Sequence, residues 1–317
     1  MITQLDSLKK LSTIVADTGD LIAIKKYKAM AATTNPSIIL KSFDNPVYKS
    51  LITSIIKEAK KEKSANKLIT YILDKLSVAI GYEISKIIPG RVSTEIAAEL
   101  SYDIDASINK AHYLIDLYKY YNVYKNKVLI KLASTWEGIR AAEILEKEGI
   151  KCNLTLLFSD AQVRACLEAR VFLISPFVGR ITDWYKKKTG NDYFIPENDP
   201  GVKFVKRVCK YTSDYAYDTI VMGASFRNTG QILDLAGCNC LTISPQLLDD
   251  LDKKEGEVKC KIYNNKKYKI KKYKTISEDE FNSLHSNDQM AKYSLYEGIN
   301  KFSEDQEKLK KIIKELL

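Results

Sequence analysis

The clearest pattern in the sequence is an almost uninterrupted apolar run over residues 127–135, which predicts a strand buried on both faces. Side chains alternate along a strand, so Lys131 shares one face with Leu129 and Ala133. Burial disfavours the charged ammonium and favours a neutral amine, which is a nucleophile for carbonyl carbon. The alternative is an ordinary lysine that extends its amine to water or pairs with a buried carboxylate. The sequence leaves both interpretations open, and polar groups at the ends of other strands favour the first.

Seven further short apolar segments predict strands, and helical patterns separate most of them. No Pro-rich or Ser-rich linker divides the chain. Strands that alternate with helices predict an α/β fold, here a single (β/α)8 TIM barrel domain over residues 1–317 with additional helices. The eight predicted strands cover residues 12–17, 31–36, 91–95, 127–135, 151–158, 171–180, 219–227 and 241–245.

Several segments predict helices. Apolar residues recur at helical spacing over residues 65–87, and the tail 290–317 reads as one long C-terminal helix. In that tail one apolar stripe is expected to contain Met290, Tyr293, Tyr296, Ile299 and Phe302, continued by Leu309, Ile313 and Leu316. Shorter helices are expected at residues 4–10, 104–121 and 200–214.

One helix start also carries a capping signal. Ser134 and Glu137 match the S-x-x-E spacing of a capping box before the helix that contains Ile139.

Composition places the chain among globular proteins, with 317 residues of which 45% are hydrophobic and 28% charged. No run approaches the roughly 18 apolar residues of a membrane span. Residues 1–6 show no basic region followed by an apolar one, so we expect no signal peptide and a cytoplasmic protein.

The net charge of +10 raises nucleic acid as a partner, but the charge is local. Residues 253–274 carry ten lysines and two glutamates, a net charge of +8, so the rest of the chain carries only +2. A lysine-rich segment of this kind is usually a solvated surface insertion, and no nucleic-acid-binding motif surrounds it.

The metal-ligating residue types are sparse and badly spaced for a metal site. His112 and His285 are the only histidines, and Cys238 and Cys240 lack the spacing of zinc ligands. We therefore expect no metal and no cofactor, with acid–base chemistry left to carboxylates and lysine.

Polar side chains end most of the predicted strands, and in a barrel these ends meet at the face that carries the active site. For Asp17 and Asn35 the alternative is that each only caps the following helix. Taken together, the set supplies an amine nucleophile, carboxylates for proton transfer, amides and hydroxyls for a polyhydroxylated substrate, and guanidiniums for a phosphate. It comprises Asp17, Thr33, Asn35, Glu95, Lys131, Asn153, Thr155, Ser175, Arg180, Ser225 and Arg227.

Seven segments, in order and spread over nearly the whole chain, resemble the transaldolase family. They are VADTGD (15–20), ATTNPS (32–37), GRVSTE (90–95), IKLASTW (130–136), CNLTL (152–156), ISPFVGR (174–180) and VMGASFRN (221–228). The lysine-rich segment 253–274 is more basic than the family would suggest, and it carries none of these motifs.

The resemblance implies a metal-free transferase of the non-oxidative pentose phosphate pathway. Such an enzyme moves a dihydroxyacetone unit reversibly from fructose 6-phosphate or sedoheptulose 7-phosphate to erythrose 4-phosphate or glyceraldehyde 3-phosphate. It implies Lys131 as the Schiff-base residue, Glu95 with Thr155 at a catalytic water, and Asp17 as the base at the C4 hydroxyl. It further implies substrate contacts for Thr33, Asn35, Asn153, Ser175, Phe177, Arg180, Ser225 and Arg227, the last three at the phosphate.

The partners implied by the resemblance are phosphorylated sugars, without a membrane or nucleic acid, and many relatives are homodimers. The nearest alternative is a fructose 6-phosphate aldolase on the same barrel. Such aldolases are shorter and carry a tyrosine where this chain has Phe177. An alternative of another class is an inactive barrel that binds nucleic acid through residues 253–274.

Overall fold

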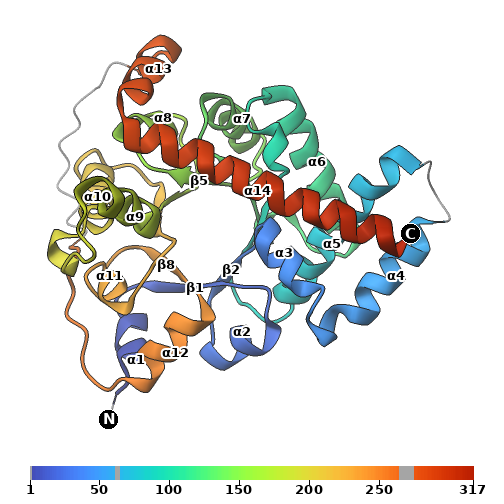
Figure 1. The fold of residues 1–317 in the computed structure, drawn as a ribbon, viewed down its shortest axis with the longest axis horizontal. Helices are drawn as coiled ribbons and strands as arrows, with labels where there is room; N and C mark the ends of the chain where they lie inside the picture. The colour runs from blue at the N-terminus through green and yellow to red at the C-terminus, as the bar shows by residue number, and fades with distance from the viewer. Residues whose placement is uncertain (1, 61–64, 264–274) are drawn as a thin grey trace.

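Eight parallel strands close into a barrel in which each strand pairs with its neighbours in sequence and β8 returns to β1. The structure is a computed structural model that describes residues 2–60, 65–263 and 275–317. Figure 1 shows the strands surrounded by helices, with the long α14 running across one side. The prediction of a (β/α)8 barrel is confirmed. The strands are β1 Thr13–Asp17, β2 Ala31–Thr33, β3 Val92–Glu95, β4 Val128–Ala133, β5 Cys152–Leu157, β6 Leu173–Pro176, β7 Ile220–Gly223 and β8 Cys240–Ile243.

Helices follow the strands and cover the outside of the barrel. The expectation that residues 1–317 form a single domain remains a prediction. The described helices are α1 Gln4–Lys9, α2 Leu21–Tyr27, α3 Pro36–Ser42, α4 Lys49–Ala59, α5 Ala65–Ser85, α6 Ile104–Tyr120, α7 Trp136–Lys147, α8 Asp160–Glu168, α9 Val178–Thr189, α10 Pro200–Asp214, α11 Thr229–Leu233, α12 Pro245–Lys253, α13 Glu278–Asn287 and α14 Gln289–Leu316. Short 3-10 turns lie at Pro46–Tyr48, Ala98–Leu100, Lys125–Lys127 and Pro196–Asn198.

Every residue of β4 is buried, as its continuous apolar pattern predicts. Ile130 belongs to the large core that includes the surrounding helices. Leu129 belongs instead to a small cluster with Val15, Leu173 and Met222, contributed by three other strands, which fills the inside of the barrel. Lys131 lies two residues after Leu129, so the strand alternation directs its side chain into the barrel as well.

Helix α14 contacts α3, α5, β5 and α9, so it lies over the carboxyl ends of several strands. The predicted stripe is only partly right. Met290, Ile299 and Phe302 are buried, but Tyr293 and Tyr296 are 48% and 61% exposed.

Small residues explain the difference, because they form the part of α14 that approaches the barrel. A Cβ added at Gly298 would lie 2.7 Å from Leu156 Cδ2, so a larger residue here would require the Leu156 side chain to shift. Ala291 and Ser294 are buried on the same helix. The buried face of α14 therefore follows small residues that a search for large apolar side chains does not detect.

The predicted capping box at Ser134 is wrong. The N-cap of α7 is Thr135, whose hydroxyl accepts a hydrogen bond from the Gly138 N–H at 2.9 Å. Ser134 instead donates to the Thr155 carbonyl at 2.7 Å, because it still lies beside β5. A capping box does form at the start of α8, between Ser159 and Gln162, where the sequence analysis did not identify one.

The sixth strand is shorter than predicted, since β6 ends at Pro176 and α9 begins at Val178. The N–H groups of Val178 and Gly179 donate to the carbonyls of Ala224 and Ser225 at 2.8 and 2.7 Å. These two hydrogen bonds direct the chain from the end of β6 into α9. Arg180 consequently lies in the first turn of α9 and not on a strand.

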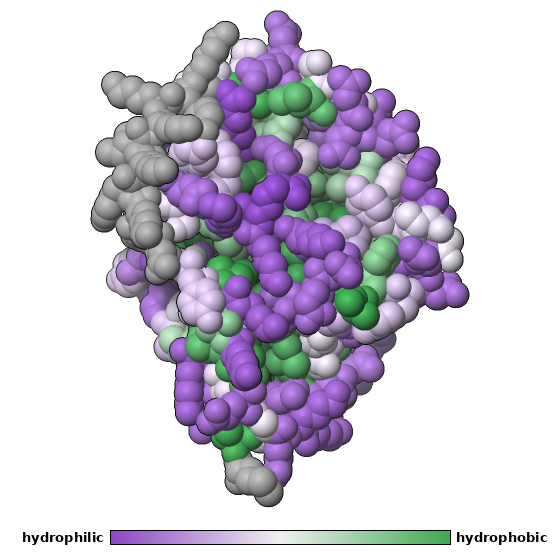
Figure 2. Space-filling model, turned by 90° about the vertical axis from the view of Figure 1, so that its left-hand side faces the viewer, coloured by the Kyte–Doolittle hydropathy of each residue, from purple (hydrophilic) through white to green (hydrophobic). Residues whose placement is uncertain are grey.

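The outer surface of the helices is mainly hydrophilic, as Figure 2 shows for one side of the molecule. No helix among the described residues is both long enough and apolar enough to cross a membrane. Half of the lysine-rich segment, residues 264–274, lies outside the described residues. Of its described lysines, Lys253 pairs with Asp249 and Lys261 pairs with Asp234.

Candidate active site

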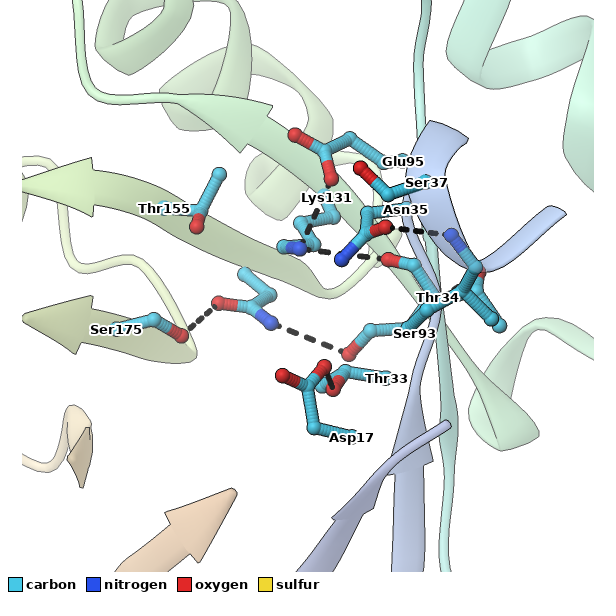
Figure 3. Close-up of polar contacts among 12 residues, drawn as sticks. Asp17, Thr33, Thr34, Asn35, Ser37, Ser93, Glu95, Lys131, Thr155 and Ser175 are labelled. Atoms are coloured by element: carbon cyan, nitrogen blue, oxygen red, sulfur yellow. Dashed lines mark hydrogen bonds and ion pairs between the residues drawn. The ribbon is translucent and has the colours of Figure 1, made fainter. Parts of the chain in front are cut away.

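Three predicted site residues lie side by side on neighbouring strands. The strand register pairs Glu95 of β3 with Lys131 of β4, and Lys131 with Asn153 of β5. The Lys131 ammonium lies 2.9 Å from Glu95 Oε2 and donates to the Thr34 carbonyl at 3.3 Å (Figure 3). Both side chains of the ion pair are only 6% exposed.

Burial raises the pKa of the Glu95 carboxyl, and the nearby Lys131 charge only partly opposes this effect. A carboxyl of this kind exchanges protons closer to neutral pH than an exposed glutamate does. The alternative interpretation of Lys131, as the partner of a buried carboxylate, thus describes its contact in the structure. The same contact gives the amine a neighbour that can accept its proton.

Asn153 is held between two hydroxyl groups. Its amide nitrogen donates to Ser93 Oγ at 3.2 Å, and its amide oxygen accepts from Ser175 Oγ at 2.6 Å. All three residues are buried. Ser93 was not among the predicted site residues. It lies two residues before Glu95, so the two-residue period of the strand could have identified it.

Asp17 is oriented by a chain of hydroxyl groups. Its Oδ1 accepts from Thr33 Oγ1 at 2.9 Å, and Thr33 Oγ1 lies 2.9 Å from Thr242 Oγ1 on β8. Asp17 does not cap α2, because the N-cap of that helix is Asp20. The capping alternative for Asp17 is therefore wrong, and Thr242 is a further site residue that the sequence analysis did not single out.

Asn35 does cap the next helix, since its side-chain oxygen accepts from the Ile38 N–H of α3 at 2.9 Å. The amide nitrogen points the other way, toward Lys131 (Figure 3). Ser37, in the first turn of the same helix, donates to Asp305 of α14. Capping thus fixes the orientation in which Asn35 presents its amide to the cavity.

Thr155 presents a hydroxyl that has no hydrogen-bond partner in the described protein, although its Oγ1 atom is buried. The residue is fully buried on β5, two positions after Asn153 and therefore on the same side of the strand. Figure 3 shows it beside Lys131, with no hydrogen bond drawn to its hydroxyl. A buried hydroxyl is rarely left unpaired, so this one is suited to a water molecule or a substrate atom.

Two guanidiniums lie at the far end of the site. Burial lowers the pKa of Arg180, and the neighbouring charge of Arg227 lowers it further. Asp183 lies three residues after Arg180 on α9, a spacing at which two helical side chains can form an ion pair. In the structure Asp183 pairs with Arg227 instead, at 3.0 Å from Nε and 2.9 Å from Nη2. Arg227 Nη1 also lies 3.3 Å from Ser225 Oγ.

Aromatic rings lie between the amine and the guanidiniums. The Phe302 ring of α14 has its centroid 5.9 Å from Lys131 Nζ and 5.7 Å from Arg180 Cζ. These two distances keep the amine and the guanidinium less than about 12 Å apart. Phe177 packs against Arg180 from the other side, with its centroid at 5.5 Å. Phe302 was predicted only as part of the apolar stripe, because its place over the barrel depends on the path of α14.

A cavity of about 620 Å³ collects these groups at the carboxyl ends of the strands. Ten of the twelve predicted site residues line it, while Glu95 and Asn153 lie behind Lys131 and Ser175. Lys41, Lys187 and Lys301 add positive charge to the lining. Among the described residues, no three His, Cys, Asp or Glu side chains gather into a set that could hold a metal ion.

Known proteins resemble this chain in sequence over almost its entire length. The family model described as Transaldolase/Fructose-6-phosphate aldolase matches residues 14–313. A protein named Transaldolase from Chromohalobacter salexigens is 57% identical over 305 residues, which are 96% of each chain. Proteins of the same name from Hamiltonella defensa and Haemophilus influenzae are 54% and 53% identical over 100% and 99% of each chain. The chain therefore belongs to the transaldolase/fructose-6-phosphate aldolase family.

Proposed function

We propose that this protein is a transaldolase of the non-oxidative pentose phosphate pathway. It moves a dihydroxyacetone unit from fructose 6-phosphate or sedoheptulose 7-phosphate to erythrose 4-phosphate or glyceraldehyde 3-phosphate. The observation that carries the proposal is Lys131, paired with the buried Glu95 behind it, in a cavity that Arg180 and Arg227 also line. A lysine amine and a proton-exchanging carboxyl at one end, with guanidiniums at the other, suit a phosphorylated ketose.

The first step is formation of a Schiff base at Lys131. The Lys131 ammonium gives one proton to Glu95, and the resulting amine attacks the C2 ketone. A second proton then moves from the nitrogen to the ketone oxygen, which becomes a hydroxyl. Glu95 then returns a proton to that hydroxyl, which leaves as water while the carbon–nitrogen double bond forms. The raised pKa of Glu95 suits both directions of this transfer. The unpaired Thr155 hydroxyl supports a role in holding the water involved.

The second step breaks the bond between C3 and C4 of the sugar. Asp17 takes the proton of the C4 hydroxyl, the aldehyde leaves, and the bonding electrons move into the imine to give a three-carbon enamine. The hydrogen bond from Thr33 keeps the Asp17 carboxylate in place for this transfer. Attack of the enamine on an acceptor aldehyde reverses the step and returns the proton.

The remaining polar groups have the chemistry needed to hold the sugar. Asn35, Asn153 and Ser175 offer amide and hydroxyl groups to the dihydroxyacetone part. Arg180, Arg227 and Ser225 offer charge-assisted hydrogen bonds to the phosphate. The limit of about 12 Å between the Lys131 amine and the Arg180 guanidinium leaves room for one extended sugar phosphate.

Phe177 favours a transferase over the aldolase alternative. Its ring lines the cavity and carries no hydroxyl that could deliver a proton to the enamine. Without that proton the three-carbon unit stays bound to Lys131 until an acceptor aldehyde arrives. Release of free dihydroxyacetone is then slow, which separates transfer from simple cleavage.

Product analysis with and without an acceptor tests the proposal. Fructose 6-phosphate with erythrose 4-phosphate should yield sedoheptulose 7-phosphate and glyceraldehyde 3-phosphate. Fructose 6-phosphate alone should yield little free dihydroxyacetone. Equal cleavage in both cases would identify an aldolase, and no conversion in either would contradict the proposed function.

The resemblance also supports a homodimer and a cytoplasmic location as proposals. Light scattering of the purified protein would test the first, since a dimer has twice the 36.0 kDa mass of the chain. A mass equal to one chain across the micromolar range would contradict it.

A further inference from the structure

We infer that Asp183 is a positioning residue for the phosphate end of the site, because its carboxylate holds Arg227 ready to receive a phosphate dianion. This inference rests on the proposed function only in taking a phosphorylated substrate as the ligand. Asp183 lies on α9, one turn after Arg180, and belongs to none of the segments that resemble the family.

The two ends of the Arg227 guanidinium contact different residues. Asp183 Oδ2 accepts from both Nε and Nη2, at 3.0 and 2.9 Å, and so occupies one edge of the planar group. Nη1 lies at the opposite end, 3.2 Å from the Ser225 carbonyl and 3.3 Å from Ser225 Oγ. A guanidinium has five N–H donors and these contacts use four, so within the described residues one Nη2 N–H at the Nη1–Nη2 end stays available for a phosphate beside the Ser225 hydroxyl.

The surroundings of Arg227 explain why it needs such support. Its side chain is 42% exposed, so without a partner it would sample many conformations in water. Arg180 is close enough that its pKa is lowered by the Arg227 charge, so the two cations repel each other before a phosphate binds. The Asp183 carboxylate offsets this repulsion and fixes one conformation in advance. Binding then avoids much of the entropy cost of ordering a long side chain.

The same carboxylate could also weaken phosphate binding. Asp183 carries a negative charge near the place where the phosphate would bind, so it could instead compete for Arg227. Competition predicts tighter phosphate binding when Asp183 is removed, whereas positioning predicts weaker binding. We favour positioning because Asp183 holds one edge of the guanidinium and leaves the other end facing Ser225 and the cavity.

The test compares Asp183→Ala and Asp183→Asn with the unchanged protein. Asp214→Ala is a matched control, because Asp214 forms an exposed ion pair with Lys210 on α10. Binding of inorganic phosphate is measured by calorimetry, and kcat and KM are measured with fructose 6-phosphate and with unphosphorylated fructose. Thermal unfolding of each variant verifies that the fold is kept.

We expect Asp183→Ala to weaken phosphate binding and to raise KM for fructose 6-phosphate about three- to tenfold, the loss associated with ordering one long side chain on binding. The kcat value and the reaction with fructose should stay within about twofold of the unchanged protein. Asp183→Asn keeps an oxygen acceptor toward Arg227 and should recover most of the loss. Asp214→Ala should change none of these values.

Unchanged or tighter phosphate binding by Asp183→Ala would overturn the inference. If phosphate binding depends on Asp183 as expected but the unchanged protein shows no transfer reaction, the proposed function fails while the inference stands. If the unchanged protein binds neither phosphate nor fructose 6-phosphate, both fail.

Discussion

Replacement of Thr155 by valine should make the protein more stable and less active. Valine has nearly the same shape as threonine and fits a strand, so the change removes the hydroxyl while leaving the packing of β5 intact. The Thr155 hydroxyl is buried and has no protein partner among the residues that the structure describes. The variant therefore separates the cost of this hydroxyl to folding from its contribution to catalysis.

The magnitude follows from the burial of the hydroxyl. An unsatisfied buried polar group costs about 1–3 kcal/mol of stability, and its removal returns part of that free energy. In a protein of this size about 1 kcal/mol shifts the melting temperature by roughly 2 °C, so we expect a rise of about 2–5 °C. Loss of one preorganised group in an active site costs about 10²-fold in turnover. A gain in stability with a loss of activity is typical of residues retained for function.

Calorimetric melting and steady-state turnover measure the two effects. Thr94→Val is the matched control, because Thr94 is also fully buried but its hydroxyl lies 2.5 Å from the Tyr118 hydroxyl. That variant should lower the melting temperature by leaving the Tyr118 hydroxyl unpaired. A lower melting temperature for Thr155→Val would show that its hydroxyl is satisfied in the free protein. Unchanged kcat would refute its role in catalysis.

Three further predictions concern other groups. Asp17→Asn should still form the imine but should lose about 10²–10⁴-fold in carbon–carbon cleavage, so that borohydride traps the intact six-carbon sugar; a three-carbon adduct alone would contradict this role. Arg227→Ala should raise KM for fructose 6-phosphate at least tenfold, because charge-assisted hydrogen bonds contribute about 1.5–3 kcal/mol, and equal losses for unphosphorylated fructose would place Arg227 in the scaffold. Burial lowers the pKa of His285, so the unfolded state binds the proton more readily, and this contribution to stability is present above the ordinary histidine pKa and lost as pH falls. The difference in melting temperature between the unchanged protein and His285→Asn should therefore decrease from pH 7.5 to pH 5.5, and a constant difference would contradict the assignment.

The barrel could be predicted because its strands are buried on both faces. Residues 128–133 are apolar except for Lys131, and such a run has few interpretations other than an internal parallel strand. The lysine then stands out against that background. Asp17 ends a short apolar strand in the same way, whereas β3, which ends in Glu95, contains Val92 as its one apolar residue.

The course of α14 could not be predicted in the same way. The position of this helix depends on the close approach of Gly298 to Leu156, two residues that are distant in the chain. The helical period alone favoured Tyr293 and Tyr296 over the small residues that are buried. The contribution of Phe302 to the site follows from this packing.

Asp183 and Thr242 were not identified from the sequence, and one physical reason explains both. Asp183 contacts Arg227 across 44 positions of sequence, and Thr242 contacts Thr33 across 209. Each pairing depends on how two strand ends or helices meet in space, which local pattern does not encode. Local spacing alone would favour Arg180 as the partner of Asp183, because the two residues are one helical turn apart.

The most direct test of the whole account is to find the lysine that forms the imine. The protein is incubated with fructose 6-phosphate, reduced with borohydride, digested and analysed by mass spectrometry. The account predicts a three-carbon adduct on Lys131 together with loss of activity, and no adduct in a Lys131→Arg variant that keeps its fold, because a guanidinium stays protonated. An adduct on Lys127 or on surface lysines, with Lys131 unmodified, would contradict the account.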